Sequence, residues 1–358
     1  MSEFLKEKVT KLLGLRAALA FSRGSAGLYA LLVAIAKRSG SGEVIVPTLC
    51  CETVALAAIY AGHSVRFADI SPETLCATPE TVAPLITSRT RAVIIVHLYG
   101  IDAQVDSFSA LRLKYPNVAF VEDIAHAFGG YGENKRFLGG SLDYTLVSFA
   151  DSKIVPGDGG MLLFGSGLLE PEDFSAEIPL DALRTPKPRV ALSMRNLVHA
   201  IADLWREEMG KRGAPIFLDM LDKYKSLIVS PGGIADEKAA IAGIDKLQTN
   251  RETRYNNYLL YRTGISSKSV MIPHFHDGST CWRCPLVFES ANKASAATEA
   301  LRAIGIPASN HYFPLSVLFD TQTCPHGEDI ALRIINLWTD ERMLADTIKK
   351  SINIINRI

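Results

Sequence analysis

Between residues 42 and 164, short runs of β-branched and aromatic residues alternate with longer segments in which apolar positions have a helical spacing. The short runs predict strands at 43–47, 63–69, 91–97, 117–123, 143–149 and 159–164. The other segments predict helices at 28–36, 52–61, 79–87 and 106–114. Strands that are apolar throughout and separated by helices are typical of a mostly parallel sheet covered on both faces. We therefore expect an α/β fold here.

The pattern changes after residue 164. Residues 165–232 contain charged stretches with helical spacing and predict a helical insertion. The remaining segments predict a long helix at 236–261 with one apolar stripe, a strand at 282–289, and helices at 291–303 and 341–355. We therefore expect two domains: residues 1–235 form a large α/β domain that contains the insertion, and residues 236–358 form a small α+β domain.

Composition narrows the kind of partner. The chain has 358 residues with 38 basic and 38 acidic side chains and 48% hydrophobic residues, which excludes a disordered chain. No dense basic block provides the surface that nucleic acid requires, so a small-molecule partner is expected. No apolar run reaches the roughly 18–20 residues of a membrane span, and the charged N-terminus lacks the core of a signal peptide. We expect a cytoplasmic protein whose six cysteines do not form a disulfide framework.

Polar residues follow the predicted strands at positions where a parallel sheet binds ligands. Asp123 ends one strand, Ser148 ends the next, and Lys153 lies in the loop after it. Ser25 and Ala26 lie at the start of the first apolar helix, and a helix N-terminus with a hydroxyl group can bind phosphate. Taken singly, these residues are more simply explained as a helix cap, a loop carboxylate and a surface lysine.

Taken together, the same residues fit one cofactor. Pyridoxal 5'-phosphate (PLP) needs a lysine amine for its Schiff base and a carboxylate that keeps its ring nitrogen protonated. It also needs hydroxyl and amide donors for its phosphate. Lys153, Asp123 and the group Ser25, Ala26 and Ser148 supply this set.

The ordered motifs resemble the DegT/DnrJ/EryC1/StrS family of PLP-dependent sugar aminotransferases, which have the aspartate aminotransferase fold (fold type I). The matching segments are RGSAGL (23–28), 43–62, 65–75, 86–100, VEDIAHAFGG (121–130), SFADSK (148–153), GDGGML (157–162), 236–247, 305–315 and the last helix. The resemblance implies a large domain with a mostly parallel, seven-stranded type of sheet and a small C-terminal domain. It also implies a homodimer with shared active sites, and transfer of an amino group from glutamate to a keto sugar, usually nucleotide-linked, in surface polysaccharide or secondary-metabolite sugar biosynthesis.

The resemblance also implies a role for individual residues. Lys153 matches the Schiff-base lysine and proton carrier, Asp123 the partner of the pyridine nitrogen, and His126 a residue near the cofactor's phenolic oxygen. The other cofactor positions are Ser25, Ala26, Cys51 and Ser148, and the substrate positions are His311 and Tyr312.

Two positions depart from the family pattern. Cys51 stands where many members place an aromatic ring over the pyridine, so stacking must be weaker or come from elsewhere. Residues 230–240 (SPGGIADEKAA) lack the Asn and Arg with which many members reach the partner's site. We therefore expect the cross-subunit contribution from nearby Arg or Tyr residues or from the insertion. The presence of Lys153 disfavours the dehydratases of the family, which replace this lysine with His.

Other interpretations stay open at this point. The chain could catalyse another PLP reaction, such as an elimination or a retro-aldol cleavage on an amino acid, or bind PLP without turnover as a regulatory or assembly subunit. Cys281 and Cys284 form a C-x-x-C without a second pair at zinc spacing, so we expect no metal site. The GDGG segment (157–160) is interpreted as a turn before a strand. His97 could face the cleft or pack in the core.

Overall fold

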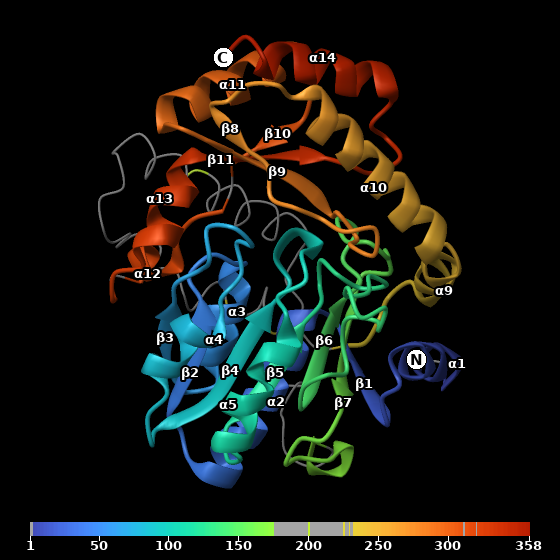
Figure 1. Cartoon of the computed structure of the whole chain (residues 1–358). Coiled ribbons are helices and arrows are strands. Elements are labelled where there is room, and N and C mark those ends of the chain that lie inside the picture. The colour runs from blue at the N-terminus through green and yellow to red at the C-terminus, as the bar shows by residue number, and fades with distance from the viewer. Residues whose placement is uncertain are drawn as a thin grey trace.

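The computed structural model describes residues 3–174, 232–310, 312–319 and 321–358, together with Ala200, Lys225 and Val229. Its larger sheet has seven strands in the order β1-β7-β6-β5-β4-β2-β3 (Figure 1). The strands are β1 (Ala17–Phe21), β2 (Glu43–Pro47), β3 (Ser64–Ala68), β4 (Thr90–Val96), β5 (Ala119–Asp123), β6 (Tyr144–Ser148) and β7 (Gly160–Phe164). Strands β3, β2, β4, β5 and β6 pair in parallel, whereas β7 runs antiparallel to both β1 and β6. The α/β prediction and the mostly parallel sheet are confirmed.

Helices pack on this sheet. They are α1 (Glu3–Leu13), α2 (Gly24–Ser39), α3 (Glu52–Tyr60), α4 (Pro79–Val82) and α5 (Ser109–Lys114). Helix α2 packs on β1, β6, β7 and α3, which explains why its apolar residues are not confined to one stripe. The six strands predicted in this region all occur, each within two residues of its expected bounds. No prediction covered α1 or β1.

A second, smaller sheet follows in the C-terminal part of the chain. Its four antiparallel strands have the order β10-β11-β9-β8. The strands are β8 (Val270–Met271), β9 (Arg283–Phe288), β10 (Ala308–Ser309) and β11 (Ile334–Trp338), and the helices are α9 (Glu237–Asp245), α10 (Leu247–Gly264), α11 (Ala291–Ala303), α12 (Leu315–Leu318), α13 (Pro325–Arg333) and α14 (Ala345–Ile355). Figure 1 shows α11 and α14 on the side of this sheet that faces away from the seven-stranded sheet.

The single helix predicted at 236–261 is wrong, because the chain breaks between α9 and α10 at Lys246. The backbone N–H of Lys246 bonds back to Gly243 and Ile244, which closes α9. The break directs the buried side chain of Leu247 against Gly129, where a Cβ atom would lie only 2.5 Å from it. A continuous helix would not carry this apolar contact, so packing overrides local helix propensity here.

Three other boundaries differ from the predictions. The helix expected at 79–87 becomes 3-10 helix (Ala83–Leu85) after Val82, because Pro84 lacks the N–H that an α-helix needs. The segment expected at 106–114 begins as 3-10 helix (Val105–Phe108) before α5. The last helix begins at Ala345 rather than 341, since the Asp340 carboxylate holds Arg342 in a turn. Most of the predicted insertion at 165–232 lies outside the described residues, and its first part contains a 3-10 turn (Pro171–Phe174).

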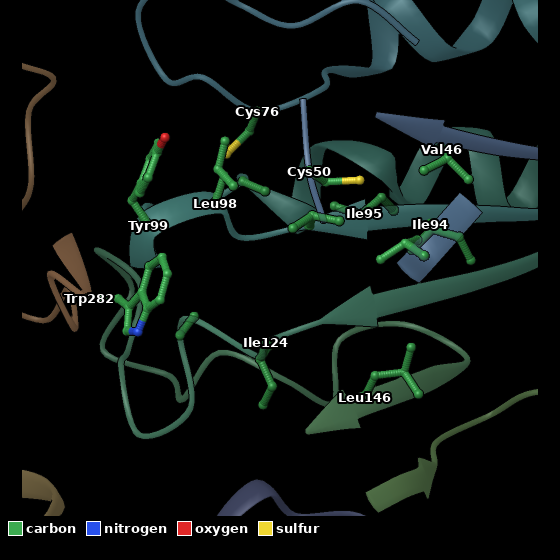
Figure 2. Close-up of a cluster of buried hydrophobic side chains, with 14 of the residues drawn as sticks. Val46, Cys50, Cys76, Ile94, Ile95, Leu98, Tyr99, Ile124, Leu146 and Trp282 are labelled. Atoms are coloured by element: carbon green, nitrogen blue, oxygen red, sulfur yellow. The ribbon is translucent and has the colours of Figure 1, made fainter. Parts of the chain in front are cut away.

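The core lies between the helices and the seven-stranded sheet. Figure 2 shows part of it, from Val46 and Ile94 in the strands to Tyr99 and Trp282 at one end. Trp282 comes from the chain just before β9, so one end of the core is completed by the part of the chain that carries the smaller sheet. Within the described residues, no helix has the length and apolarity to cross a membrane.

Candidate active site

A cavity of about 290 Å³ lies where β4, β5 and β6 end and where α2 begins. Parallel strands present their carboxyl ends on one edge of the sheet, which is where such folds bind ligands. The predicted site residues that line this cavity are Ser25, Cys51, Asp123, His126, Ser148 and Lys153. They come from four separate segments of the chain, and the fold brings them together.

Helix α2 is held close to the end of β6. Its N-terminus packs on Gly160 of β7, where a Cβ atom would lie 2.3 Å from the backbone nitrogen of Gly24. Only glycine permits this approach, which places Ser25 beside Ser148 in the cavity wall. Ala26 is buried in the same first turn and does not line the cavity. The first-turn amide groups of a helix have no acceptor within the helix and favour an anion.

Asp123, the last residue of β5, is buried with 8% of its surface exposed. Its Oδ1 accepts a hydrogen bond of 2.9 Å from the backbone N–H of Ala125. Burial raises the pKa of Asp123, and the hydrogen bond from Ala125 together with the nearby side chains of Lys153 and His97 only partly opposes this effect. A carboxylate in this position favours a positively charged group within the cavity.

The geometry around His126 defines the state of Lys153. The backbone N–H of Tyr99 donates to Nδ1 of His126 at 3.3 Å, so the proton of a neutral imidazole lies on Nε2. Nε2 lies 2.8 Å from Nζ of Lys153, and with this tautomer Nζ can accept the hydrogen bond as an uncharged amine. Burial lowers the pKa of Lys153, in agreement with this arrangement. An uncharged amine is the nucleophilic form of lysine.

Trp282 is part of the site and was missed by the sequence analysis. Its indole stacks on the imidazole of His126, with ring centroids 3.8 Å apart, and Nζ of Lys153 lies 4.8 Å from the indole centroid. Its Nε1–H donates to the carbonyl of Ser152 at 2.6 Å. The only signal in the sequence was an aromatic and a basic residue at the start of an otherwise apolar strand pattern, WRCPLVFE.

Of the two residues predicted to contact the substrate, Tyr312 lies beside the cavity residue His126, whereas the position of His311 is not described. Tyr312 is buried, and its hydroxyl lies 3.4 Å from Nε2 of His126. Its ring also packs edge-on against Tyr99, with centroids 5.4 Å apart. His311 lies outside the described residues.

Cys51 lines the cavity as a neutral thiol. Its Sγ lies 3.1 Å from Oγ1 of Thr53, and burial raises the pKa of the thiol to about 12. The side chain therefore provides neither a thiolate nor an aromatic face at neutral pH.

His97 packs in the core directly behind the cavity. Its Nδ1 accepts from the backbone N–H of Ala103 at 3.1 Å, and its Nε2 lies 3.1 Å from Oε1 of Glu122. Burial opposes the charged form, but the hydrogen bond and charge of Glu122 outweigh it and raise the pKa of His97. His97 and Glu122 are both fully buried. Of the two alternatives that the sequence left open for His97, facing the cleft or packing in the core, the structure shows the second.

The remaining motifs have structural roles. Cys281 and Cys284 are buried free thiols, and no cluster of potential metal ligands occurs in the described part of the chain. The GDGG segment forms the turn that leads into β7 at Gly160, as predicted.

The cavity fits the requirements of PLP. It contains an uncharged lysine amine and a buried carboxylate, and Ser148 stands beside a helix N-terminus suited to phosphate. The fold is that of the PLP-dependent transferases of fold type I.

Comparison with known proteins agrees with the motifs. Residues 2–172, just under half of the chain, match the model of the DegT/DnrJ/EryC1/StrS aminotransferase family, which confirms the resemblance seen in the motifs.

Solved structures share the fold over 99% of this chain. DesI, crystallised in the presence of its TDP-sugar product, is 23% identical with a TM-score of 0.73 and is covered over 83% of its chain. PseC of Helicobacter pylori, an aminotransferase involved in the biosynthesis of pseudoaminic acid, is 18% identical with a TM-score of 0.77 and 90% coverage. The PLP form of Spr1654 from Streptococcus pneumoniae is 17% identical with a TM-score of 0.72 and 90% coverage.

Proposed function

We propose that this aminotransferase transfers the amino group of glutamate to a nucleotide-linked keto sugar, in surface polysaccharide or secondary-metabolite sugar biosynthesis. The observation that carries the proposal is the meeting of Lys153, Asp123 and Ser148 in one cavity of a chain that matches this family over residues 2–172. The sugar acceptor is supported by two structural relatives, since DesI was crystallised in the presence of its TDP-sugar product and PseC is involved in the biosynthesis of pseudoaminic acid.

Each residue has a proposed task. Lys153 would hold the cofactor through Nζ, and Asp123 would balance a positive charge on the pyridine nitrogen. Ser25, Ser148 and the first-turn amide of Ala26 would bind the phosphate, and His126 would lie near the phenolic oxygen. When bound, PLP supplies an electron sink for the charge that forms at the substrate carbon.

Proton transfer would be carried out by Nζ of Lys153. The uncharged amine can accept the proton released at the α-carbon of the amino acid and would deliver it to the carbon on the other side of the amino nitrogen. The hydrogen bond from Nε2 of His126 orients the amine and favours its uncharged form. Trp282 covers this pair and excludes water from one side.

We further propose a homodimer whose two sites are shared, as the family resemblance implies. The cavity opens to the surface and contains no Asn from the 230–240 segment, so a neighbouring chain has a place to contribute. Light scattering at micromolar concentration tests this arrangement, and a fully active monomer would reject it.

A half-reaction assay tests the function. The purified protein is loaded with PLP, L-glutamate is added without acceptor, and the visible spectrum is followed. Conversion to the pyridoxamine form with release of 2-oxoglutarate is the expected result. Release of ammonia or cleavage of the amino acid would indicate another PLP reaction, and no spectral change with any amino acid would indicate a binding subunit without turnover.

A further inference from the structure

Tyr99 has a backbone conformation that a bulky residue rarely adopts. Its torsion angles are φ 59° and ψ 2°, in the left-handed region, inside the short 3-10 turn Leu98–Gly100 that follows β4. Residues with a Cβ atom are strained in this region, and glycine or asparagine usually occupies it. The tyrosine ring is fully buried. Strain of this kind persists where the surrounding structure requires it, and it concentrates at functional positions.

The turn is fixed at both of its ends. The backbone N–H of His97 donates to the carbonyl of Asp123 at 3.1 Å, and Nδ1 of His97 accepts from the N–H of Ala103 at 3.1 Å. At the other end, Gly100 lies so close to the segment before β9 that a Cβ atom would overlap Oγ1 of Thr280. The turn is therefore held against the seven-stranded sheet on one side and against the segment that leads into the smaller sheet on the other.

The left-handed conformation gives the two peptide groups of Tyr99 a partner each. Its N–H donates to Nδ1 of His126 at 3.3 Å, and its carbonyl accepts from the N–H of Trp282 at 2.8 Å. A residue with negative φ would send the chain, and with it the carbonyl, in a different direction. The ring centroid lies 6.5 Å from that of His126, 6.4 Å from that of Trp282 and 5.4 Å from that of Tyr312. Figure 2 shows Tyr99 beside Trp282 at this end of the core.

The bond from Tyr99 decides which nitrogen of His126 carries the proton. A neutral imidazole has one N–H and one acceptor nitrogen, and Nδ1 is the acceptor because the N–H of Tyr99 faces it. Moving the proton to Nδ1 would lose this bond and set two N–H groups against each other. The proton therefore lies on Nε2, which is 2.8 Å from Nζ of Lys153 and 3.4 Å from the hydroxyl of Tyr312.

We propose that Tyr99 is a positioning residue that fixes the tautomer of His126. Its left-handed backbone directs an N–H at Nδ1, which keeps a hydrogen-bond donor on Nε2, the nitrogen beside Lys153. The consequence for catalysis rests on the proposed function, since His126 acts there on the amine of Lys153. The tautomer itself does not depend on turnover, so it can be measured without substrate.

Nitrogen NMR of the full chain, with PLP removed, reports the tautomer. Histidine is labelled with the NMR-active nitrogen isotope, and the signals of His126 are identified by their absence in His126→Gln. The chemical shifts of Nδ1 and Nε2 then show which atom carries the proton. Wild type should have a protonated Nε2 and an unprotonated Nδ1. A protonated Nδ1 in wild type would overturn the proposal without any further variant.

Two substitutions of Tyr99 separate the effect of the backbone from that of the ring. Tyr99→Gly and Tyr99→Val both remove the ring, but glycine adopts a φ of 59° freely, whereas β-branched valine does not. The glycine variant should keep the proton on Nε2 as wild type does. The valine variant should show nitrogen shifts averaged between the two tautomers. The same shifts in both variants would overturn the proposal. Tyr99→Ala replaces the valine variant if that variant does not fold, because its Cβ atom is strained at the same φ.

Lys135→Val is the matched control. Lys135 has the same φ of 59° but is exposed and does not line the cavity. The substitution should therefore leave the nitrogen shifts of His126 unchanged. Shifts altered as in Tyr99→Val would show that backbone strain far from His126 has the same effect, and would overturn the proposal.

The half-reaction with glutamate distinguishes failure of this inference from failure of the proposed function. At saturating glutamate, Tyr99→Val should react about fivefold more slowly than Tyr99→Gly, as for the loss of one neutral hydrogen bond. Half-saturation should be the same in both variants, because Tyr99 acts on Lys153 through His126 and not on the substrate. Equal rates despite different nitrogen shifts would overturn the positioning role. If glutamate gives no half-reaction in wild type but the nitrogen shifts differ as expected, the proposed function fails and the assignment of Tyr99 stands.

Discussion

Replacing Asp123 by Asn should have opposite effects on folding and on chemistry. Asn keeps the shape of the side chain, and its Oδ1 can still accept from the N–H of Ala125 at 2.9 Å. What disappears is the negative charge at the bottom of the cavity. The substitution therefore tests the charge of Asp123 rather than its packing.

The stability effect follows from the raised pKa of Asp123. Between the ordinary and the raised pKa, the folded protein binds more protons than the unfolded chain, so stability falls as pH increases through this window. Above the window the ionised carboxylate costs about 1.4 kcal/mol for each pKa unit of the shift. The cofactor-free Asp123→Asn variant should therefore be more stable than wild type at pH 7.5, with the difference shrinking toward pH 4.

The effect on chemistry has the opposite sign. Asn cannot balance a positive charge on the pyridine nitrogen, so we expect the half-reaction with glutamate to slow by roughly 10²–10⁴-fold, as when a positioned charge or proton-transfer group is removed. PLP should still bind, because its phosphate contacts are unchanged. Unfolding in urea and stopped-flow absorbance measure the two effects.

Asp143→Asn is the matched control. Asp143 is also buried but lies away from the cavity, where it accepts from Nε of Arg112 at 2.7 Å and from the N–H of Phe120 at 2.8 Å. Its loss should lower stability and leave the half-reaction rate unchanged. A near-normal rate in Asp123→Asn, or a cofactor-free variant less stable than wild type at pH 7.5, would refute the reasoning.

Four further predictions concern the lysine, for which there are two, the phosphate site and the indole. Burial lowers the pKa of Lys153, so between the lowered and the ordinary lysine pKa the unfolded chain binds one more proton than the folded protein. In this pH window the free energy of unfolding of the cofactor-free wild type should increase by up to about 1.4 kcal/mol per pH unit relative to Lys153→Met, measured by urea unfolding at pH 7–10. Parallel plots of unfolding free energy against pH for the two proteins would contradict this. Borohydride reduction should attach PLP to Lys153, and mass spectrometry finding the label on another lysine would reject the assignment. Ser148→Ala should weaken PLP binding at least about 10-fold in equilibrium titrations, the value of a hydrogen bond to a charged group, and unchanged affinity would remove Ser148 from the phosphate site. Trp282→Phe keeps an aromatic ring but loses the hydrogen bond from the indole N–H to the carbonyl of Ser152. Hydrogen exchange of the backbone amides of residues 150–155 should therefore accelerate roughly fivefold, as for a loss of about 1 kcal/mol. Exchange at the wild-type rate would show that this hydrogen bond does not hold the loop.

The parts of the fold that follow from local pattern were predictable. Each strand of the parallel sheet is a short apolar run between helical segments, and burial on both faces leaves this pattern clear in the sequence. Asp123, Ser148 and Lys153 could be assigned to one edge because parallel strands end on the same side. Local pattern also fixed α11, which begins after the capping residue Ser290 and ends as predicted.

The features that depend on distant contacts were not predictable. The break at Lys246 exists because Leu247 packs on Gly129, more than a hundred residues earlier in the chain. Strands β8 and β10 have two residues each and leave no periodic signal. Trp282 enters the site only because β9 and the loop after β6 are neighbours in space, which no spacing along the chain reveals.

The active site thus depends on contacts between the two sheets. The hydroxyl of Thr280 donates to the carbonyl of His126 at 2.6 Å, the N–H of Trp282 donates to the carbonyl of Tyr99 at 2.8 Å, and the indole holds Ser152. These bonds fix the imidazole that bonds to Lys153, so the state of the amine depends on a segment 130 residues further along the chain. We therefore expect the orientation of Lys153 to depend on Trp282, which lies directly before β9 and contacts both His126 and Lys153.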